Sequence, residues 1–135
     1  MSDLVVDASV VLTWCFPDEH SSEATRILDL VRIPGNRVVV PSFFHQEVLN
    51  ALLERRNRIT FAAAEEFMED ILKLPIRPVS PDHTLVSAIA DLSRRHRLTA
   101  YDATYLELAL RLRLPLASFD HALVGASVAE GIPAL

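Results

Sequence analysis

The amino-acid sequence predicts an α/β protein: a three-layer α/β/α sandwich around a central, mostly parallel sheet of four or five strands. Short apolar runs at residues 4–6 (LVV) and 38–40 (VVV) have the composition of strands that are buried on both faces. Segments with helical patterning separate these runs, and strands that alternate with helices are typical of a parallel sheet covered on both sides. Because the 135 residues contain no linker, repeat or low-complexity stretch, we expect a single domain, 1–135.

Turn and capping residues delimit the expected elements. Pro17 stops a first short helix, and Ser42, Thr60 and Ser80 have the side chains of helix N-caps. Pro78 favours an edge position for the strand that contains it. The expected strands are residues 4–6, 38–40, 76–79 and 115–118, and a short fifth strand at 132–135 is the alternative to a four-stranded sheet. The expected helices span about residues 8–16, 23–32, 41–57, 60–73, 80–96, 99–113 and 120–129.

Composition narrows the possible environments and partners. Half of the residues are hydrophobic and the mean hydropathy is +0.25, which indicates that a partner covers part of the surface. The net charge of -5 gives no overall attraction to nucleic acid, so any polyanion must be held locally. The single cysteine, Cys15, excludes an internal disulfide. With no secretory signal and no apolar run near the roughly 20 residues of a membrane span, we expect a cytoplasmic protein with no membrane contact.

Two aspartates directly follow expected strands. Asp7 comes after strand 4–6 and Asp120 comes after strand 115–118, and open parallel sheets bind ligands at the carboxyl ends of their strands. Ser118 lies two residues before Asp120, so both side chains should point to the same side. The structural alternative is that each aspartate is a helix N-cap or a satisfied turn residue.

Asp102 and Glu47 lie on helices rather than strands. Thr99 and Asp102 fit a capping box, which would explain the aspartate without chemistry. On a helical wheel, however, Asp102 projects with Leu106, away from the polar stripe of that helix, which favours an inward, functional position. Glu47 lies at the border of an apolar face, where solvated glutamates are common, and Asn50 at i+3 could help to hold a carboxylate or its bound water.

The four carboxylates are more informative together than singly. Two like charges about 4 Å apart repel by about 4 kcal/mol at an effective dielectric near 20, so four in one crevice require a cation. Oxygen ligands favour Mg²⁺ or Mn²⁺ over zinc. The predicted metal ligands and catalytic residues are Asp7, Glu47, Asp102 and Asp120.

Four stretches resemble the PIN-domain nucleases, and most closely the VapC-type toxins of toxin–antitoxin pairs. They are VVDASVVLTW from residue 5, PSFFHQEVLNAL from 41, LTAYDATYLELA from 98 and PLASFD from 115. The resemblance implies a PIN-like fold and a metal-dependent endoribonuclease in which the same acidic quartet binds Mg²⁺ or Mn²⁺. It also implies supporting roles for Ser9, Asn50 and Ser118, an RNA substrate, a cognate antitoxin and a homodimer.

Other functional classes fit less well. A phosphoacceptor receiver needs an acidic pair after its first strand and a late lysine, whereas Lys73 is the only lysine and is poorly placed. A haloacid-dehalogenase-type phosphatase needs D-x-D, but position 9 is serine. The remaining alternative is a catalytically silent PIN-like module that binds RNA or protein. Two arginine clusters, within residues 55–58 and 94–97, are either phosphate contacts or solvated charges at helix C-termini.

Overall fold

The central sheet has four parallel strands in the order β3-β2-β1-β4. The structure is a computed structural model, and the residues that it describes are 2–80, 82–133 and 135. The strands are β1 (Leu4–Val6), β2 (Val38–Pro41), β3 (Ile76–Val79) and β4 (Leu116–Ala117). Every residue of β1 and β2 is buried, as expected for apolar runs in the middle of a parallel sheet. The proline-containing strand β3 lies at an edge, so that prediction is confirmed.

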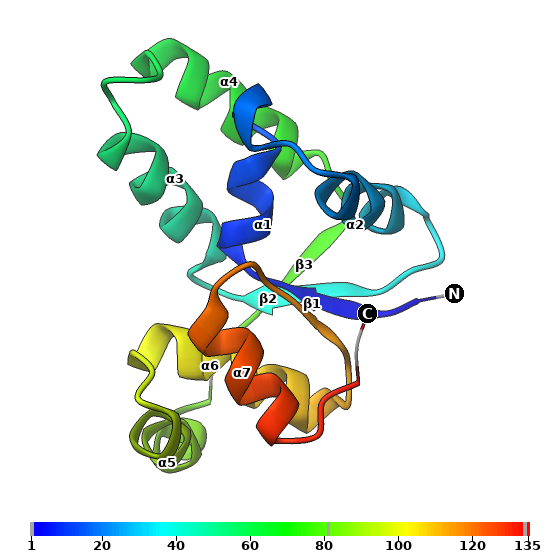
Figure 1. Ribbon diagram of the computed structural model, residues 1–135, viewed down its shortest axis with the longest axis vertical. Helices are drawn as coiled ribbons and strands as arrows, with labels where there is room; N and C mark the ends of the chain where they lie inside the picture. The colour runs from blue at the N-terminus through cyan, green and yellow to red at the C-terminus, as the bar shows by residue number, and fades with distance from the viewer. Residues whose placement is uncertain (1, 81, 134) are drawn as a thin grey trace.

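Helices cover both faces of the sheet, so the predicted three-layer sandwich is confirmed. In Figure 1, α1 to α4 lie on one side of the sheet and α5 to α7 lie on the other. The helices are α1 (Ala8–Thr13), α2 (Ser22–Arg32), α3 (Phe44–Glu54), α4 (Phe61–Leu72), α5 (Val86–His96), α6 (Ala100–Leu112) and α7 (His121–Ala129). Two 3₁₀ turns span Pro17–Glu19 and His83–Leu85. None of the helices in the described residues is long and apolar enough to cross a membrane.

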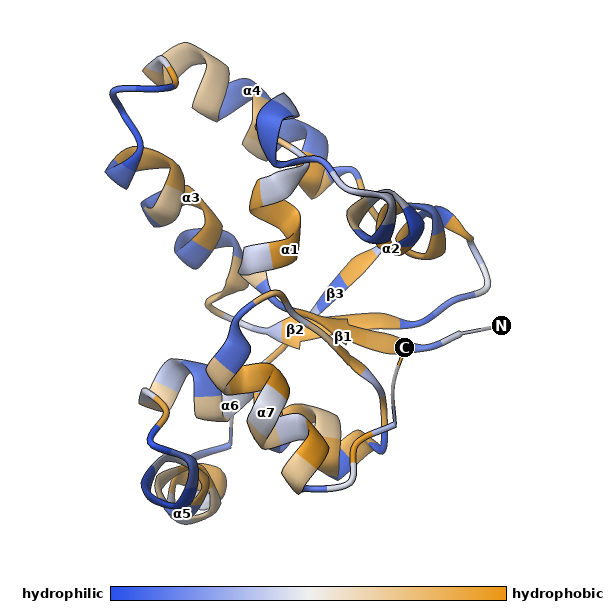
Figure 2. Cartoon of the chain, viewed as in Figure 1, coloured by the Kyte–Doolittle hydropathy of each residue, from blue (hydrophilic) through white to orange (hydrophobic). Residues whose placement is uncertain are grey.

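The apolar strands and the inner faces of the helices form one core (Figure 2). Helix α6 carries the longest run of buried residues on any one helix, from Tyr105 to Ala109. Tyr105 and Phe44, the first residue of α3, are the two largest side chains that are fully buried. The starts of α3 and α6 are therefore anchored in the core, next to the carboxyl ends of β1 and β2.

The structure corrects two boundaries in the first half of the chain. Helix α1 ends at Thr13 instead of residue 16, because Phe16 precedes Pro17 and has an extended backbone, the conformation that a following proline favours. Ser42 does not cap α3, which begins at Phe44 after a turn at Phe43 and has no side-chain cap. Helix α3 also ends at Glu54 rather than near residue 57, whereas Thr60 caps α4 as expected.

Two further corrections concern the second half. Asp82, rather than Ser80, is the capping residue before α5, because its carboxylate accepts the N–H of Thr84 at the start of a 3₁₀ turn. Pro81, predicted as the first helical residue, lies outside the described residues. No fifth strand forms at Ile132, Pro133 or Leu135, and Ala134 lies outside the described residues. The sheet of the described residues therefore has four strands, and β4 is an edge.

Candidate active site

Asp7 lies at the end of β1, where the chain enters α1. Its backbone N–H donates to the carbonyl of Ala117 in β4 (2.9 Å), and only 5% of the residue is exposed. Two hydroxyl groups donate to its Oδ2 atom: Ser9 Oγ at 2.8 Å and Ser118 Oγ at 2.7 Å. The Asp7 carboxylate is thus buried at the carboxyl edge of the sheet and held from both sides.

The same two hydroxyl groups also organise the loop after β4. Ser9 Oγ accepts the backbone N–H of Phe119 (2.9 Å), and Ser118 Oγ accepts that of Asp120 (3.0 Å). Each serine therefore donates to Asp7 and accepts from the loop. The beginning of α1 and the end of β4, more than a hundred residues apart in sequence, are connected through one carboxylate.

Glu47 is held by a tyrosine that local sequence patterns do not reveal. The buried hydroxyl of Tyr105 in α6 donates to Glu47 Oε1 in α3 at 2.6 Å. In the described part of the chain, Asn50 makes no direct hydrogen bond to this carboxylate: it is exposed and donates to Glu54 at 3.3 Å, and its predicted role through a bound water stays a prediction. Two features of the sequence could have indicated a role for Tyr105. It lies at i+3 from Asp102, on the same face of the helix, and a buried tyrosine needs a hydrogen-bond partner for its hydroxyl.

Asp102 and Asp120 lie at the starts of two helices. Thr99 Oγ1 accepts the N–H of Asp102 (3.1 Å), so Thr99 is the N-cap of α6 and the Asp102 side chain remains half-buried near the sheet edge. Asp120 is itself the N-cap of α7, because its Oδ1 atom accepts the N–H of Leu123 (3.0 Å). The structural role considered for Asp120 is therefore present, and one oxygen of its carboxylate is used for it.

The carboxylates perturb one another. Burial raises the pKa of Asp7, the hydroxyls of Ser118 and Ser9 lower it, and the charge of Asp120 raises it again. Burial also raises the pKa of Glu47, which Tyr105 lowers and the charges of Asp7 and Asp102 raise. The pKa of Asp102 is raised by burial and then by Asp7 and Asp120. Four acids that are dispersed in the sequence are thus connected electrostatically: Glu47 is influenced by Asp7 and Asp102, and Asp102 by Asp7 and Asp120.

The four carboxylates are the right type of ligand for a divalent cation, but in this structure their side chains are not gathered around one point. Within the described residues, none of the four carboxylates forms an ion pair with an arginine, lysine or histidine. Among the described residues, no three histidine, cysteine, aspartate or glutamate side chains lie close enough together to hold a metal ion. Repulsion between like charges disfavours such a cluster of carboxylates. The donors are all oxygen atoms, as Mg²⁺ and Mn²⁺ prefer.

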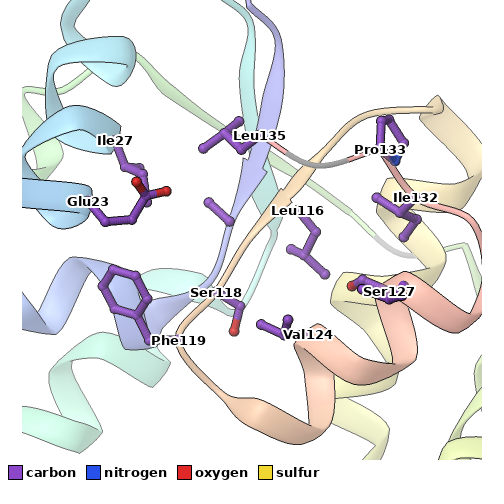
Figure 3. Close-up of a pocket in the computed structure, with 12 residues that line it drawn as sticks. Glu23, Ile27, Leu116, Ser118, Phe119, Val124, Ser127, Ile132, Pro133 and Leu135 are labelled. Atoms are coloured by element: carbon purple, nitrogen blue, oxygen red, sulfur yellow. The ribbon is translucent and has the colours of Figure 1, made fainter.

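An apolar cavity lies beside this site. It has a volume of about 260 Å³ and lies between α2, β4 and α7, lined by side chains such as Ile27, Leu116 and Val124 (Figure 3). Ser118 contributes to its lining, whereas none of the four carboxylates of the site does. The acidic site and this cavity are therefore separate features that share one serine.

Comparison with known proteins now identifies the family. The PIN domain model matches residues 4–127, which is most of the chain and includes all four acids. The chain belongs to the PIN-domain family. It is 31% identical over 126 residues to ribonuclease VapC3 of Mycobacterium tuberculosis, in each of two strains, covering 91% of this chain and 86% of the relative. Divalent-metal dependence is general among PIN-domain ribonucleases.

Solved structures agree with this assignment at the level of the fold. The crystal structure of M. tuberculosis VapC20, described as a sarcin-ricin loop cleaving toxin, superposes with a TM-score of 0.70 at 17% identity, covering 98% of both chains. That of PAE2754 from Pyrobaculum aerophilum gives 0.67 at 19% identity, covering 93% of this chain and 84% of the other. The predicted PIN-like architecture is confirmed.

In this PIN domain, Tyr105→Phe tests the contact to Glu47. A hydrogen bond to a charged group contributes about 1.5–3 kcal/mol, so the free energy of unfolding should fall by up to about 2 kcal/mol at neutral pH. Because this bond lowers the pKa of Glu47, its loss should raise that pKa further and move the acid limb of the pH profile of kcat/KM to higher pH. An unchanged acid limb would show that Tyr105 does not control this carboxylate.

Proposed function

We propose that this PIN domain is an Mg²⁺- or Mn²⁺-dependent endoribonuclease and the toxin of a toxin–antitoxin pair. The observation that carries the proposal is the electrostatically coupled set of carboxylates at the carboxyl edge of the sheet, which lacks a basic partner among the described residues. The similarity to ribonuclease VapC3 over nearly the whole chain supports RNA as the substrate class. A cognate antitoxin, a homodimer and a cytoplasmic location are parts of the same proposal.

The proposed metal ligands are Asp7, Glu47, Asp102 and Asp120. When bound, a divalent cation lowers the pKa of water and neutralises negative charge that develops on phosphodiester oxygens. Asp7 has the most rigidly held carboxylate of the four, because Ser9 and Ser118 donate hydrogen bonds to it and the residue is buried. Glu47 and Asp102 are half-buried, and burial raises the pKa of each while no cation is bound; in the reaction, one of the carboxylates would accept a proton from the attacking water.

A cleavage assay separates this proposal from a catalytically silent PIN-like module. A mixed pool of transfer, ribosomal and messenger RNA would be incubated with the protein and Mg²⁺ or Mn²⁺, and in parallel with EDTA. We expect discrete cleavage products that EDTA and the Asp102→Asn substitution both suppress. Binding of RNA without cleavage under every metal condition would favour the silent module instead.

The two arginine clusters are largely committed to contacts within the protein. Arg55 and Arg58 both pair with Glu19, at 2.8 and 3.0 Å, and their guanidinium groups lie over the ring of Phe16. The second cluster forms a similar network: Arg94 and Arg95 pair with Asp91, and Arg95 also pairs with Glu130. Arg56 and Arg97 are both exposed and make no ion pair with the described residues. Arg56 donates to the carbonyl of Leu53 (2.9 Å), whereas Arg97 is the C-cap of α5, two residues before the cap of α6.

We therefore expect Arg97, but not Arg55, to contact RNA phosphate. Arg97→Gln should weaken RNA binding at low salt and reduce the slope of log Kd against log salt concentration by about one. Arg55→Ala is the control: it removes an ion pair and a cation–π contact, so it should cost about 1 kcal/mol of stability without changing that slope. Equal slopes for the wild type and Arg97→Gln would exclude the phosphate contact.

A further inference from the structure

A cavity of about 340 Å³ adjoins the carboxylate site between the start of α3 and the start of α6. Its lining consists of Phe43, Gln46, Glu47, Asn50 and Tyr101. Glu47 therefore belongs both to the acidic site and to the wall of this cavity. Figure 1 shows the two helices on opposite sides of the sheet, facing each other beyond the carboxyl ends of the strands. A ligand in the cavity would thus lie next to Glu47, one of the proposed metal ligands.

Two aromatic rings form one part of the cavity wall. Tyr101 is 63% exposed, although it neighbours Asp102 at the start of a well-buried helix. Its ring packs edge-to-face against Phe43 at a centroid distance of 5.1 Å, and Phe43 packs in the same manner against the buried Tyr105 at 5.8 Å. The exposed ring is therefore supported from the core outward, and one of its sides remains available to a planar ligand.

Side-chain amides form another part of the wall. Gln46 and Asn50 are exposed on α3, one turn apart, on either side of Glu47 in sequence. Amides donate and accept hydrogen bonds at the same time, as the edges of nucleobases do. An aromatic platform with amides beside it is the combination by which proteins bind unpaired bases of RNA.

We propose that this cavity binds an unpaired nucleobase of the RNA next to the cleaved phosphodiester, with Tyr101 as the stacking platform and Gln46 and Asn50 at the base edge. This inference rests on the proposed ribonuclease function and adds a source of substrate preference to it. The volume is within the range of about 300–1,000 Å³ that is typical of small-ligand pockets. Base stacking would also help to hold a polyanion on a chain whose net charge is -5.

The first test measures binding of a short, fluorescein-labelled, single-stranded RNA pool by polarisation, in an Asp7→Asn background and with EDTA so that cleavage of the probe is suppressed. Tyr101→Leu keeps apolar bulk but loses the ring, and Kd should rise about tenfold. Tyr101→Phe keeps the ring and should bind within about twofold of the parent. Phe61→Leu, at an aromatic residue of similar exposure (65%) at the start of α4, is the matched control and should not change Kd.

The second test uses the active protein. Sequencing of cleavage ends should show a base preference next to the cut site that Gln46→Ala alters while the protein still cleaves. If the wild type cleaves RNA and Tyr101→Leu binds and cleaves like it, the nucleobase site is wrong and the ribonuclease function stands. If the wild type neither binds nor cleaves any RNA, both proposals fail.

Discussion

Replacing Asp7 by asparagine should reduce RNA cleavage by about a hundredfold or more and should leave the protein folded. Loss of a residue that merely orients a metal ligand typically costs 10- to 100-fold, and loss of a ligand itself should cost at least as much. The carboxamide is close in shape to the carboxylate and keeps an oxygen that can accept from Ser9 and Ser118.

The same substitution should raise stability when no cation is present. Burial raises the pKa of Asp7, which means that the folded state disfavours its ionised form. A neutral side chain removes that penalty, so the melting temperature in EDTA should be equal to or higher than that of the wild type. Asp70→Asn on the exposed side of α4 is the isosteric control and should change neither cleavage nor melting. Wild-type cleavage by Asp7→Asn would remove Asp7 from the active site.

Adding Mg²⁺ or Mn²⁺ should stabilise the protein near neutral pH and EDTA should reverse the effect. A ligand that binds only the folded state at about 100 times its Kd adds about 2.7 kcal/mol, which for a chain of this size raises Tm on the order of 10 °C. Differential scanning fluorimetry with a cation titration measures this shift. The Asp7→Asn variant should respond weakly, because one of the proposed ligands has lost its charge.

The pH dependence of this stabilisation has a definite sign. The pKa values of Asp7, Glu47 and Asp102 are raised in the folded state above the usual 3.8 for aspartate and 4.5 for glutamate. Above about pH 4 these carboxyls ionise in the unfolded chain at a lower pH than in the folded chain. The free energy of unfolding without a cation therefore falls as the pH rises, until the carboxyls of the folded chain have also ionised. Cations bind the ionised forms, so the cation-induced rise in Tm should grow over the same interval. A cation effect that is independent of pH would argue against carboxylate ligands.

The sheet could be predicted from the sequence because its two central strands are short, continuous apolar runs, a pattern typical of strands that are buried on both faces. The sequence predicted the helix starts less well where the cap is unconventional. Ser42 has the right side chain for a cap, but the chain continues through a turn to Phe43, whose aromatic contacts with Tyr101 and Tyr105 place it between α3 and α6. Packing between helices that are distant in sequence decided that boundary, and local capping signals do not contain this information.

The site illustrates the same limit. Each proposed ligand was selected from its position at a strand end or on a helical face, but the side chains that hold these acids depend on tertiary contacts. The spacing along a strand placed Ser118 on the same side as Asp120, and its supporting role came from the family resemblance, whereas Tyr105 was missed. Asn50 donates to Glu54, and its support of the Glu47 site stays a prediction. The hydroxyl of Tyr105 reaches Glu47 across the space between two helices, 58 positions apart in the chain. Such partners become visible only when the helices have been placed.

The pairing of β1 with β4 has a consequence for the timing of activity during synthesis. Asp7 receives hydrogen bonds from Ser9 and from Ser118, and β1 lies beside a strand made more than a hundred residues later. A chain still on the ribosome, folding from its N-terminal end, has no partner for that side of β1 and no second hydroxyl for Asp7. We therefore expect the nascent polypeptide to leave the surrounding RNA uncut until β4 and Ser118 have emerged and joined β1.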